Sequence, residues 1–378
     1  MKKGLLSYIL IFFYLIGAGQ GLIKGKVMEK DSKTPIENVN VYISNSSIGT
    51  RTDANGLFTL RTPAAGKFEL VLSSMGYATK MVPLTIEEKL DNLMIDLSSK
   101  ANDLPEVVLR TYIKDGWKLW GKFFLEQFIG SYPINADCKI LNPNVIHFQF
   151  KRKDSVLKAF AEETILVENK KLGYLLHYDL IEFSHDFLNN RTFYQGYPFF
   201  EDLKNSETKK VINKREEVYK GSLMHFMRSV FTNQIKENNF EVRRMVKILD
   251  RNGAKIRIDG NANLEATDQV RYEMASDYLV GDSIAYGISD NTVGMYFKNY
   301  LLVAYKNKQA PYFYTSRYRS NFNLPYISSE LTLLLHQPIM VYPNGSFSEA
   351  NNLLLSGYLG WAEKLGNMLP FDYKPIKK

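Results

Sequence analysis

The residues best suited to chemistry in this 378-residue chain stand together between positions 177 and 186. His177, Asp179 and His185 occupy odd positions, which lie on one side of a β-strand. Imidazole and carboxylate groups on one face can bind a metal, or form a general base and the group that orients it. However, His177 and His185 are ~26 Å apart in an extended strand, so one metal could bind both only if the strand bent back. The weak catalytic candidates are therefore His177, Asp179 and Glu182, and the alternative is a solvent-facing polar stripe.

Other catalytic signatures are missing from the sequence. It contains no Gly-rich nucleotide loop, no Gly-x-Ser-x-Gly nucleophile turn and no His-Glu-x-x-His motif. The single cysteine, Cys138, excludes an intrachain disulfide and a cysteine-rich zinc site, and we interpret it as a buried, inert thiol. We therefore expect a protein without metal or cofactor that is not an enzyme.

Positive charge is concentrated in one stretch of the chain. The formal net charge is +8, and residues 204–257 hold fourteen Lys or Arg against six Asp or Glu, which accounts for the whole excess. Arg243, Arg244 and Lys247 crowd one predicted strand there. The interpretations are a solvated surface, or a binding surface for an acidic glycan, lipid head groups or an envelope protein.

A second group of candidate binding residues follows Pro311, where aromatic side chains alternate with arginines. The group comprises Tyr312, Phe313, Tyr314, Arg317, Tyr318 and Arg319, of which Tyr312, Tyr314 and Arg317 are the binding candidates. Aromatic rings in a loop can stack on sugars, whereas rings in a strand fill the core. The sequence leaves both alternatives open.

The first residues predict export. Lys2 and Lys3 precede the apolar run Leu5–Ile16, and small residues follow it, as in a secretory signal peptide. We expect residues 1–20 to be removed, the alternative being an uncleaved anchor. No later segment approaches the ~20 apolar residues of a membrane helix, so we expect no transmembrane helix in the mature chain. The predicted location is the periplasm, the outer membrane or the cell surface of a Gram-negative bacterium, which excludes nucleic acid as the expected partner.

Residues 21–98 predict an all-β sandwich. Apolar residues alternate with polar ones in short runs, as at Val39 and Val41, and turn-forming residues separate these runs. Asn55-Gly56 is a strong hairpin signal because both residues tolerate a positive φ. About seven such strands in about eighty residues indicate two packed sheets. Asp53 is expected to cap the hairpin turn and Phe58 to point into the core.

Four motifs in this segment resemble the carboxypeptidase-regulatory-like domain, which is a transthyretin-like sandwich. They are residues 23–27, 34–41, 49–58 and 74–77, which read IKGKV, TPIENVNV, GTRTDANGLF and SMGY. The resemblance implies a non-catalytic accessory or binding module. It implies no carboxypeptidase, because none of the five histidines is followed three positions later by the glutamate of a zinc-binding His-x-x-Glu pair.

The remainder predicts a linker over residues 99–113 and an α+β domain with an antiparallel sheet over 114–378. One amphipathic helix, packed on a sheet, is predicted from aromatic residues three and four positions apart: Trp117, Trp120, Phe124 and Phe128. Residues 139–200 predict an antiparallel meander. Further helices are expected between residues 207 and 235, with Gly221 as a break, and from 349 to 368.

Parts of this second domain resemble the uncharacterised C-terminal part that accompanies such sandwiches in small exported bacterial proteins. The resemblance rests on residues 115–128, 215–228 and 357–370, and it implies no biochemical function. We therefore predict a non-catalytic envelope protein whose sandwich and α+β domain bind or organise another envelope component. The alternative is an envelope hydrolase that acts on a glycan or peptidoglycan through the C-terminal domain.

Overall fold

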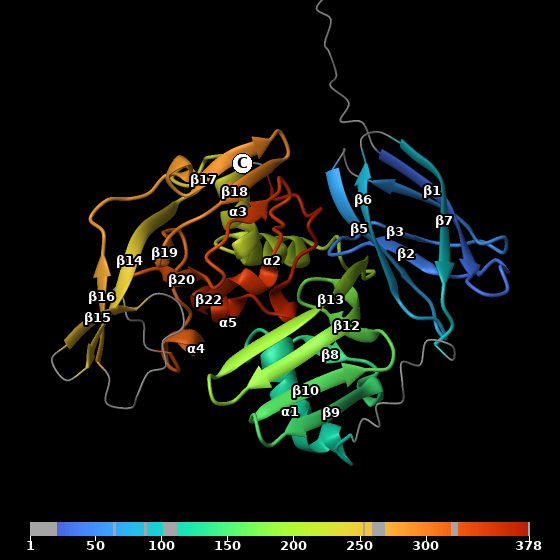
Figure 1. Ribbon diagram of the computed structural model, residues 1–378, viewed down its shortest axis with the longest axis horizontal. Coiled ribbons are helices and arrows are strands. Elements are labelled where there is room, and N and C mark those ends of the chain that lie inside the picture. The colour runs from blue at the N-terminus through green and yellow to red at the C-terminus, as the bar shows by residue number, and fades with distance from the viewer. Residues whose placement is uncertain are drawn as a thin grey trace, which may run out of the picture.

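The protein is described here by a computed structural model that covers residues 21–62, 66–86, 89–100, 112–251, 254–258, 269–318 and 324–376. These residues form three hydrophobic cores, of which one lies within the sandwich, while the other two share residues between the middle and C-terminal regions. Figure 1 shows the sandwich in blue, a middle unit (residues 112–202) in green and a C-terminal unit (residues 209–376) in yellow to red. The predicted signal peptide and most of the predicted linker lie outside the described residues.

The N-terminal region is the predicted β-sandwich. One sheet has the order β4-β1-β7, formed by Leu57–Thr62, Gly21–Glu29 and Lys89–Leu97. The other has the order β3-β2-β5-β6, formed by Gly49–Arg51, Asn40–Ile43, Gly66–Ser73 and Lys80–Ile86. Strand β1 runs parallel to β7 and antiparallel to β4. Because alternate residues of β4 are buried, the period-two pattern identified the core face correctly.

The hairpin turn before β4 has the predicted chemistry. The Asp53 Oδ1 atom accepts hydrogen bonds from the backbone N–H groups of Asn55 and Leu57, both at 2.9 Å. Gly56 has a φ of 73°, and a Cβ there would lie 2.4 Å from the Val27 carbonyl oxygen, so only glycine fits. Phe58 is 4% exposed and belongs to the sandwich core. The expectations for Asp53 and Phe58 are therefore confirmed.

In the middle unit, helix α1 (Gly116–Phe128) packs on an antiparallel sheet. The sheet has the order β8-β11-β12-β10-β9, with β13 beside β12, and its strands are Cys138–Ile140, Ile165–Asn169, Tyr174–Asp186, Val156–Ala161, Ile146–Lys151 and Arg191–Asp202. The Phe124 ring of α1 meets the Phe148 ring of β9 at 5.8 Å, which confirms the predicted helix and its packing.

The order of these strands differs from the predicted meander. One edge of β12 pairs first with β11 and then, beyond residue 182, with β10, while the other edge pairs with β13. The register of β12 against β13 shifts between Leu180 and Glu182. Because β12 is long enough to have two successive partners, a simple strand-after-strand order is not formed.

The C-terminal unit begins with two helices, α2 (Lys209–Tyr219) and α3 (Leu223–Phe231). Its larger sheet has the order β15-β14-β19-β20-β22, with β16 on β14, from strands Ala254–Ile258, Phe240–Arg251, Tyr300–Tyr305, Ile327–Leu333, Leu353–Gly357 and Gln269–Met274. A small sheet joins β17 (Ala285–Ser289), β18 (Thr292–Met295) and β21 (Ile339–Val341). Short helices α4 and α5 span Tyr312–Thr315 and Tyr358–Ala362.

Short 3₁₀ helices complete the description, at Pro143–Val145, Gly281–Ser283, Ala350–Asn352 and Leu365–Asn367. The break at Gly221 is confirmed: its φ is 75°, and a Cβ there would lie 2.7 Å from the Tyr305 ring. Within the described ranges, no helix has both the length and the apolar character needed to span a membrane. The α+β fold class is therefore confirmed for the second region, which contains two of the three cores.

The final helix predicted over residues 349–368 is wrong. Leu353, Leu354 and Leu355 pair with β20 as an edge strand, and Gly357 then adopts a φ of 72°. Only Tyr358–Ala362 is α-helical. The leucine-rich segment therefore forms a strand because it pairs with β20, although the spacing of its apolar residues predicts a helix.

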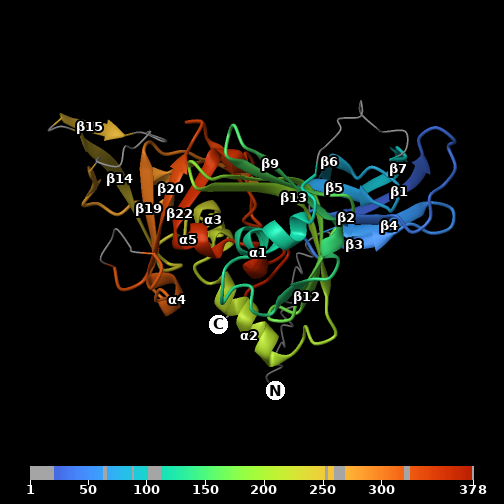
Figure 2. The same cartoon turned by 90° about the horizontal axis from the view of Figure 1, so that it is seen from below.

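The sandwich contacts the middle unit through its β2–β3 turn. The backbone N–H of Asn45 donates to the Pro198 carbonyl at 2.8 Å, and the N–H of Phe200 donates to the Ser46 carbonyl at 3.0 Å. The chain's C-terminal segment reaches the same turn, because the N–H of Phe371 donates to the Asn45 carbonyl at 2.7 Å. Figure 2 shows β2 and β3 beside β13 from below.

Candidate functional site

The polar segment of β12 does not converge on one site. His177 is half-buried, and its Nε2 lies 2.9 Å from Glu201 Oε2 on β13. His185 is 2% exposed, and its Nδ1 lies 2.8 Å from the Thr192 hydroxyl. Glu182 is exposed. In the part of the chain that the structure describes, no group of three His, Cys, Asp or Glu side chains is arranged to hold a metal ion.

Asp179 instead connects the sandwich to the middle unit. Its carboxylate is 7% exposed and accepts hydrogen bonds from the Thr164 hydroxyl and from the Tyr42 hydroxyl, the latter at 2.8 Å. The Tyr42 ring also lies 5.1 Å from the Phe199 ring. Because Asp179 and His185 are both buried, the stripe is not solvent-facing at these two positions.

The variant Tyr42→Phe is expected to lower the free energy of unfolding by about 1–3 kcal/mol, because it removes a hydrogen bond from a buried carboxylate. Urea unfolding of the full chain measures this loss. Tyr77→Phe, at a half-buried tyrosine of the same sandwich, is the matched control and should change stability little. Equal losses in the two variants would contradict the role assigned to Tyr42.

The predicted basic residues of β14 do not form one free patch. The Arg243 guanidinium lies 4.1 Å from the centre of the Tyr278 ring and donates to its hydroxyl. The Lys247 amine pairs with the Glu330 carboxylate and lies 4.2 Å from the centre of the Tyr300 ring. Arg244 is exposed. Two of the three cations therefore have partners within the protein.

The candidate residues after Pro311 divide between a core role and an exposed one, and Tyr312–Thr315 form the short helix α4 rather than a strand. Tyr314 is 6% exposed and packs against Trp361 with ring centres 5.4 Å apart, so it belongs to the core. Tyr312 is 77% exposed, and Arg317 is also exposed. Only Tyr312 and Arg317 are thus available to a ligand.

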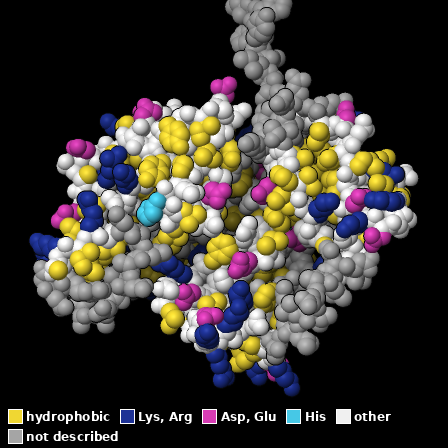
Figure 3. All heavy atoms as spheres, viewed as in Figure 1, with side chains coloured by type: hydrophobic (Ala, Val, Ile, Leu, Met, Phe, Trp, Pro, Cys, Tyr) yellow, Lys and Arg dark blue, Asp and Glu magenta, His cyan; other side chains and the backbone are white. Residues whose placement is uncertain are grey.

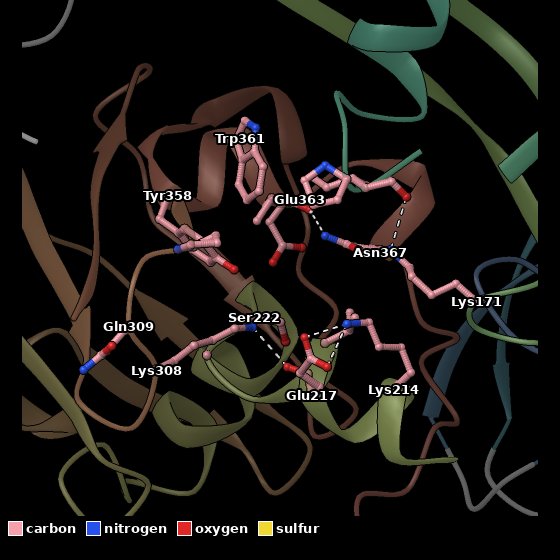
Figure 4. Close-up of a pocket in the computed structure, with 16 residues that line it drawn as sticks. Lys171, Lys214, Glu217, Ser222, Lys308, Gln309, Tyr358, Trp361, Glu363 and Asn367 are labelled. Carbon is pink, nitrogen blue, oxygen red and sulfur yellow. Dashed lines mark hydrogen bonds and ion pairs between the residues drawn. The ribbon is translucent and has the colours of Figure 1, made fainter. Parts of the chain in front are cut away.

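A cleft of about 310 Å³, lined in part by Pro311, which precedes Tyr312 in the sequence, is our candidate functional site. Segments far apart in the sequence line it: the loop before β8, α2, the loop after β19, and α5 with the residues that follow (Figure 4). The β11–β12 turn adds Lys171, and the other segments supply the charged side chains Lys214, Glu217, Lys308 and Glu363. Tyr358 and Trp361 give the cleft an aromatic wall.

Glu363 is held in the cleft by a backbone hydrogen bond. Its Oε1 accepts a hydrogen bond from the Leu223 N–H, the first residue of α3, at 2.8 Å. Burial raises the pKa of Glu363, while this hydrogen bond and the nearby Lys308 charge act in the opposite direction. Figure 4 shows Glu363 near Trp361 on one side of the cleft, with Glu217 and Lys214 on the opposite side.

The lysines of the cleft are in two different environments. Lys308 Nζ donates to the carbonyls of Glu217 and Lys220 at the end of α2, at 3.0 and 3.2 Å, and Lys171 Nζ donates to Asn367 Oδ1 at 2.9 Å. Burial lowers the pKa of both amines. Lys214, by contrast, forms a 2.7 Å ion pair with Glu217.

Exposed aromatic rings stand at the edge of this cleft. Tyr132 is 53% exposed and Phe313 is 42% exposed, and their rings meet edge-to-face at 4.9 Å. Pro133, which follows Tyr132, and Pro311, two residues before Phe313, line the cleft. We call Tyr132, Tyr312 and Phe313 the aromatic rim. Sequence reasoning found Tyr312 but missed the lysines and Glu363, because no local motif connects them.

Cys138 is half-buried, and its thiol lies 3.8 Å from the Ile134 carbonyl oxygen. Burial is the main cause that raises the pKa of this thiol to about 11. A thiol of this kind is protonated at neutral pH and a poor nucleophile. Its environment agrees with the interpretation of an inert cysteine.

Comparison with solved structures gives only distant similarities. They include a type II cohesin–X-dockerin complex from Acetivibrio cellulolyticus, with 21% identity, 19% of this chain and 52% of that chain covered, and a TM-score of 0.16. The 3-chlorocatechol 1,2-dioxygenase of Rhodococcus opacus has 13% identity, coverage of 22% and 60%, and a TM-score of 0.18. A Bacteroides uniformis protein provisionally described as carbohydrate-binding has 8% identity, coverage of 43% and 60%, and a TM-score of 0.18.

The chain thus spans between about half and three fifths of the length of these solved chains, and similarities this low carry no functional argument. No curated protein matches the sequence. A family match exists for the sandwich alone: residues 23–109 match the family described as CarboxypepD_reg-like domain. With the sandwich topology and the Asp53 turn, this match confirms that the chain carries an N-terminal carboxypeptidase-regulatory-like domain.

Proposed function

We propose that this protein is an exported, non-catalytic envelope protein whose cleft binds a glycan that carries acidic groups. The observation that supports this most directly is the aromatic rim beside a cleft that contains Lys171, Lys214 and Lys308. The export part of the proposal is supported by Lys2, Lys3 and the apolar run that follows them.

The chemistry of the cleft suits a sugar with a carboxylate. The faces of exposed aromatic rings can stack on the apolar face of a sugar. Asn367, Gln309 and Glu363 offer hydrogen-bond donors and acceptors for hydroxyl groups. A ligand carboxylate near Lys171 and Lys308 would favour their charged forms, whose pKa values burial has lowered. Binding should therefore take up protons at alkaline pH.

The sandwich has a supporting role in this proposal. Its β2–β3 turn contacts both β13 and the segment after the cleft, through Pro198, Phe200 and Phe371. Lys171 and Asn367, which meet in the cleft, belong to the two units that these contacts hold together. The sandwich thus helps to organise the binding region without contributing a side chain to its lining.

Binding is tested by titrating the mature protein with a uronic-acid polymer and with a neutral polymer of similar length, in an isothermal calorimeter. We expect binding to the acidic polymer only. Tyr312→Ala should weaken it about tenfold, because one exposed stacking ring is lost and about 1.4 kcal/mol corresponds to a factor of ten.

The matched control is Tyr286→Ala, at a half-exposed tyrosine of β17 outside the cleft lining. It should leave the affinity unchanged. A wild-type protein that binds neither polymer, or equal affinities in the two tyrosine variants, would overturn the proposal.

An envelope hydrolase is the second candidate, and the cleft itself supplies the observation in its favour. Glu363 and Glu217 line one cleft in different environments, since burial raises the pKa of Glu363 whereas Glu217 pairs with Lys214. Glycoside hydrolysis uses two carboxyl groups that differ in this way. Release of reducing ends by the wild type, lost in Glu363→Gln, would replace the binding function with this one.

A further inference from the structure

We propose that the face formed by α1 and two turns of the middle unit is a docking surface for an anionic lipid bilayer. Its apolar members, which we call the α1 face, are Leu119, Trp120, Phe123, Phe150, Phe187 and Leu188. This surface is separate from the cleft, because none of these residues lines it.

Three chain segments converge to build this face. The Trp120 ring stacks on the Phe150 ring with centres 5.8 Å apart and lies 5.9 Å from the Phe187 ring. The Phe123 ring stacks on Phe187 at 5.2 Å. The Phe187 N–H also donates to the Ser155 carbonyl at 3.1 Å, which joins the β12–β13 turn to the β9–β10 turn. The aromatic rings are therefore held in place by contacts within the protein, without a bound partner.

Large apolar side chains at the edge of this cluster project into water. Leu188 is 74% exposed, Leu119 is 64% exposed and Phe187 is 39% exposed. Figure 2 shows α1 facing the viewer with no other element drawn in front of it. Because burying apolar surface is favourable, a partner that covers these three side chains gains binding energy.

Positive charge surrounds the apolar residues. Lys118 and Lys122 are exposed on α1 on either side of Leu119, and exposed Lys151, Arg152 and Lys153 follow Phe150. Figure 3 shows Lys and Arg side chains at the lower edge of the molecule, where the strands β9 and β10 lie in Figure 1. The exposed acidic residues between them are fewer: Asp115 and Asp154.

The combination of exposed apolar side chains and surrounding lysines is suited to binding a lipid bilayer. Aromatic and aliphatic side chains enter the boundary between head groups and acyl chains, while lysines beside them pair with anionic head groups. Charge complementarity therefore identifies the partner as an anionic membrane surface.

The test is co-sedimentation of the mature protein with vesicles, in the form without residues 1–20, whose apolar run would itself bind lipid. One set of vesicles is phosphatidylcholine alone, and the other contains added phosphatidylglycerol. We expect binding to the second set only, weakened by salt because the lysine contribution is screened. Leu119→Ser combined with Leu188→Ser should reduce partitioning about tenfold or more.

Charge and position are tested separately. Lys118→Glu combined with Lys122→Glu should also reduce partitioning, whereas Leu335→Ser and Lys298→Glu, at exposed positions of the C-terminal unit, should not. Since every substituted side chain is exposed, all variants are expected to fold, which circular dichroism checks. Absence of vesicle binding, equal binding to neutral vesicles, or unchanged binding by both double variants would overturn the proposal. Self-association through this face without vesicle binding would do the same.

Discussion

Phe124→Ala is expected to lower the free energy of unfolding by about 3–5 kcal/mol. Phe124 is fully buried between α1 and its sheet. Its ring meets those of Phe128, Phe148 and Phe183 at 4.9, 5.8 and 4.8 Å. Alanine removes these contacts and leaves a cavity that rigid neighbouring rings cannot fill, so the helix loses its main attachment.

The loss is measured by urea unfolding followed with tryptophan fluorescence, since Trp117 and Trp120 lie on the same helix. Leu119→Ala is the control, because Leu119 is 64% exposed and a substitution there should cost within about 0.5 kcal/mol. If Phe124→Ala unfolded at the same urea concentration as the wild type, the packing of α1 on its sheet would not depend on this ring.

The second large effect concerns pH. His225 is 8% exposed, and its ring packs against Tyr219 and Phe240 with centres 4.8 and 4.9 Å apart. Burial lowers the pKa of this imidazole from 6.5 to about 4. Between these values the unfolded chain binds the proton and the folded chain does not, so stability falls as the pH decreases through this window. The expected loss from His225 is about 3 kcal/mol.

The variant His225→Gln removes this titration and offers an acceptor for the Gly221 N–H, which lies 3.2 Å from His225 Nδ1. The difference in unfolding free energy between wild type and variant should therefore change between pH 7 and pH 4, the wild type losing more. His336→Gln, at an exposed histidine, provides the control. A difference that stays constant over this range would contradict a buried neutral His225.

The sequence correctly predicted those elements that depend on residues close together in the chain. The Asp53 turn and the β-sandwich depend on residues a few positions apart, and the aromatic stripe of α1 depends on helical spacing. The strand β22 was missed because Leu353, Leu354 and Leu355 become a strand only by pairing with β20, about twenty residues earlier. A local pattern contains no information on such a partner.

The candidate site was predicted less well, for a similar reason. Lys171, Lys308 and Glu363 come from three distant segments, and nothing near any of them in the sequence identifies a cleft. Asp179 was named as a weak catalytic candidate, but in the structure it connects the sandwich to the middle unit. This role depends on Tyr42, which lies 137 positions away in another domain. Tyr312 was named as a binding candidate from the sequence, and it is exposed and follows Pro311, which lines the cleft.

The contact of Phe371 with Asn45 has a consequence for folding during synthesis of the protein. Asn45 is synthesised early, yet the residues that complete its surroundings, Phe371 and Asp372, leave the ribosome more than three hundred residues later. Until then the β2–β3 turn has backbone and hydroxyl groups without their final partners. Because the same segment follows Glu363 and Asn367 of the cleft, its contact with the turn joins the sandwich to the cleft region. A chain that lacks residues 371 and 372 is therefore expected to expose this turn to proteases.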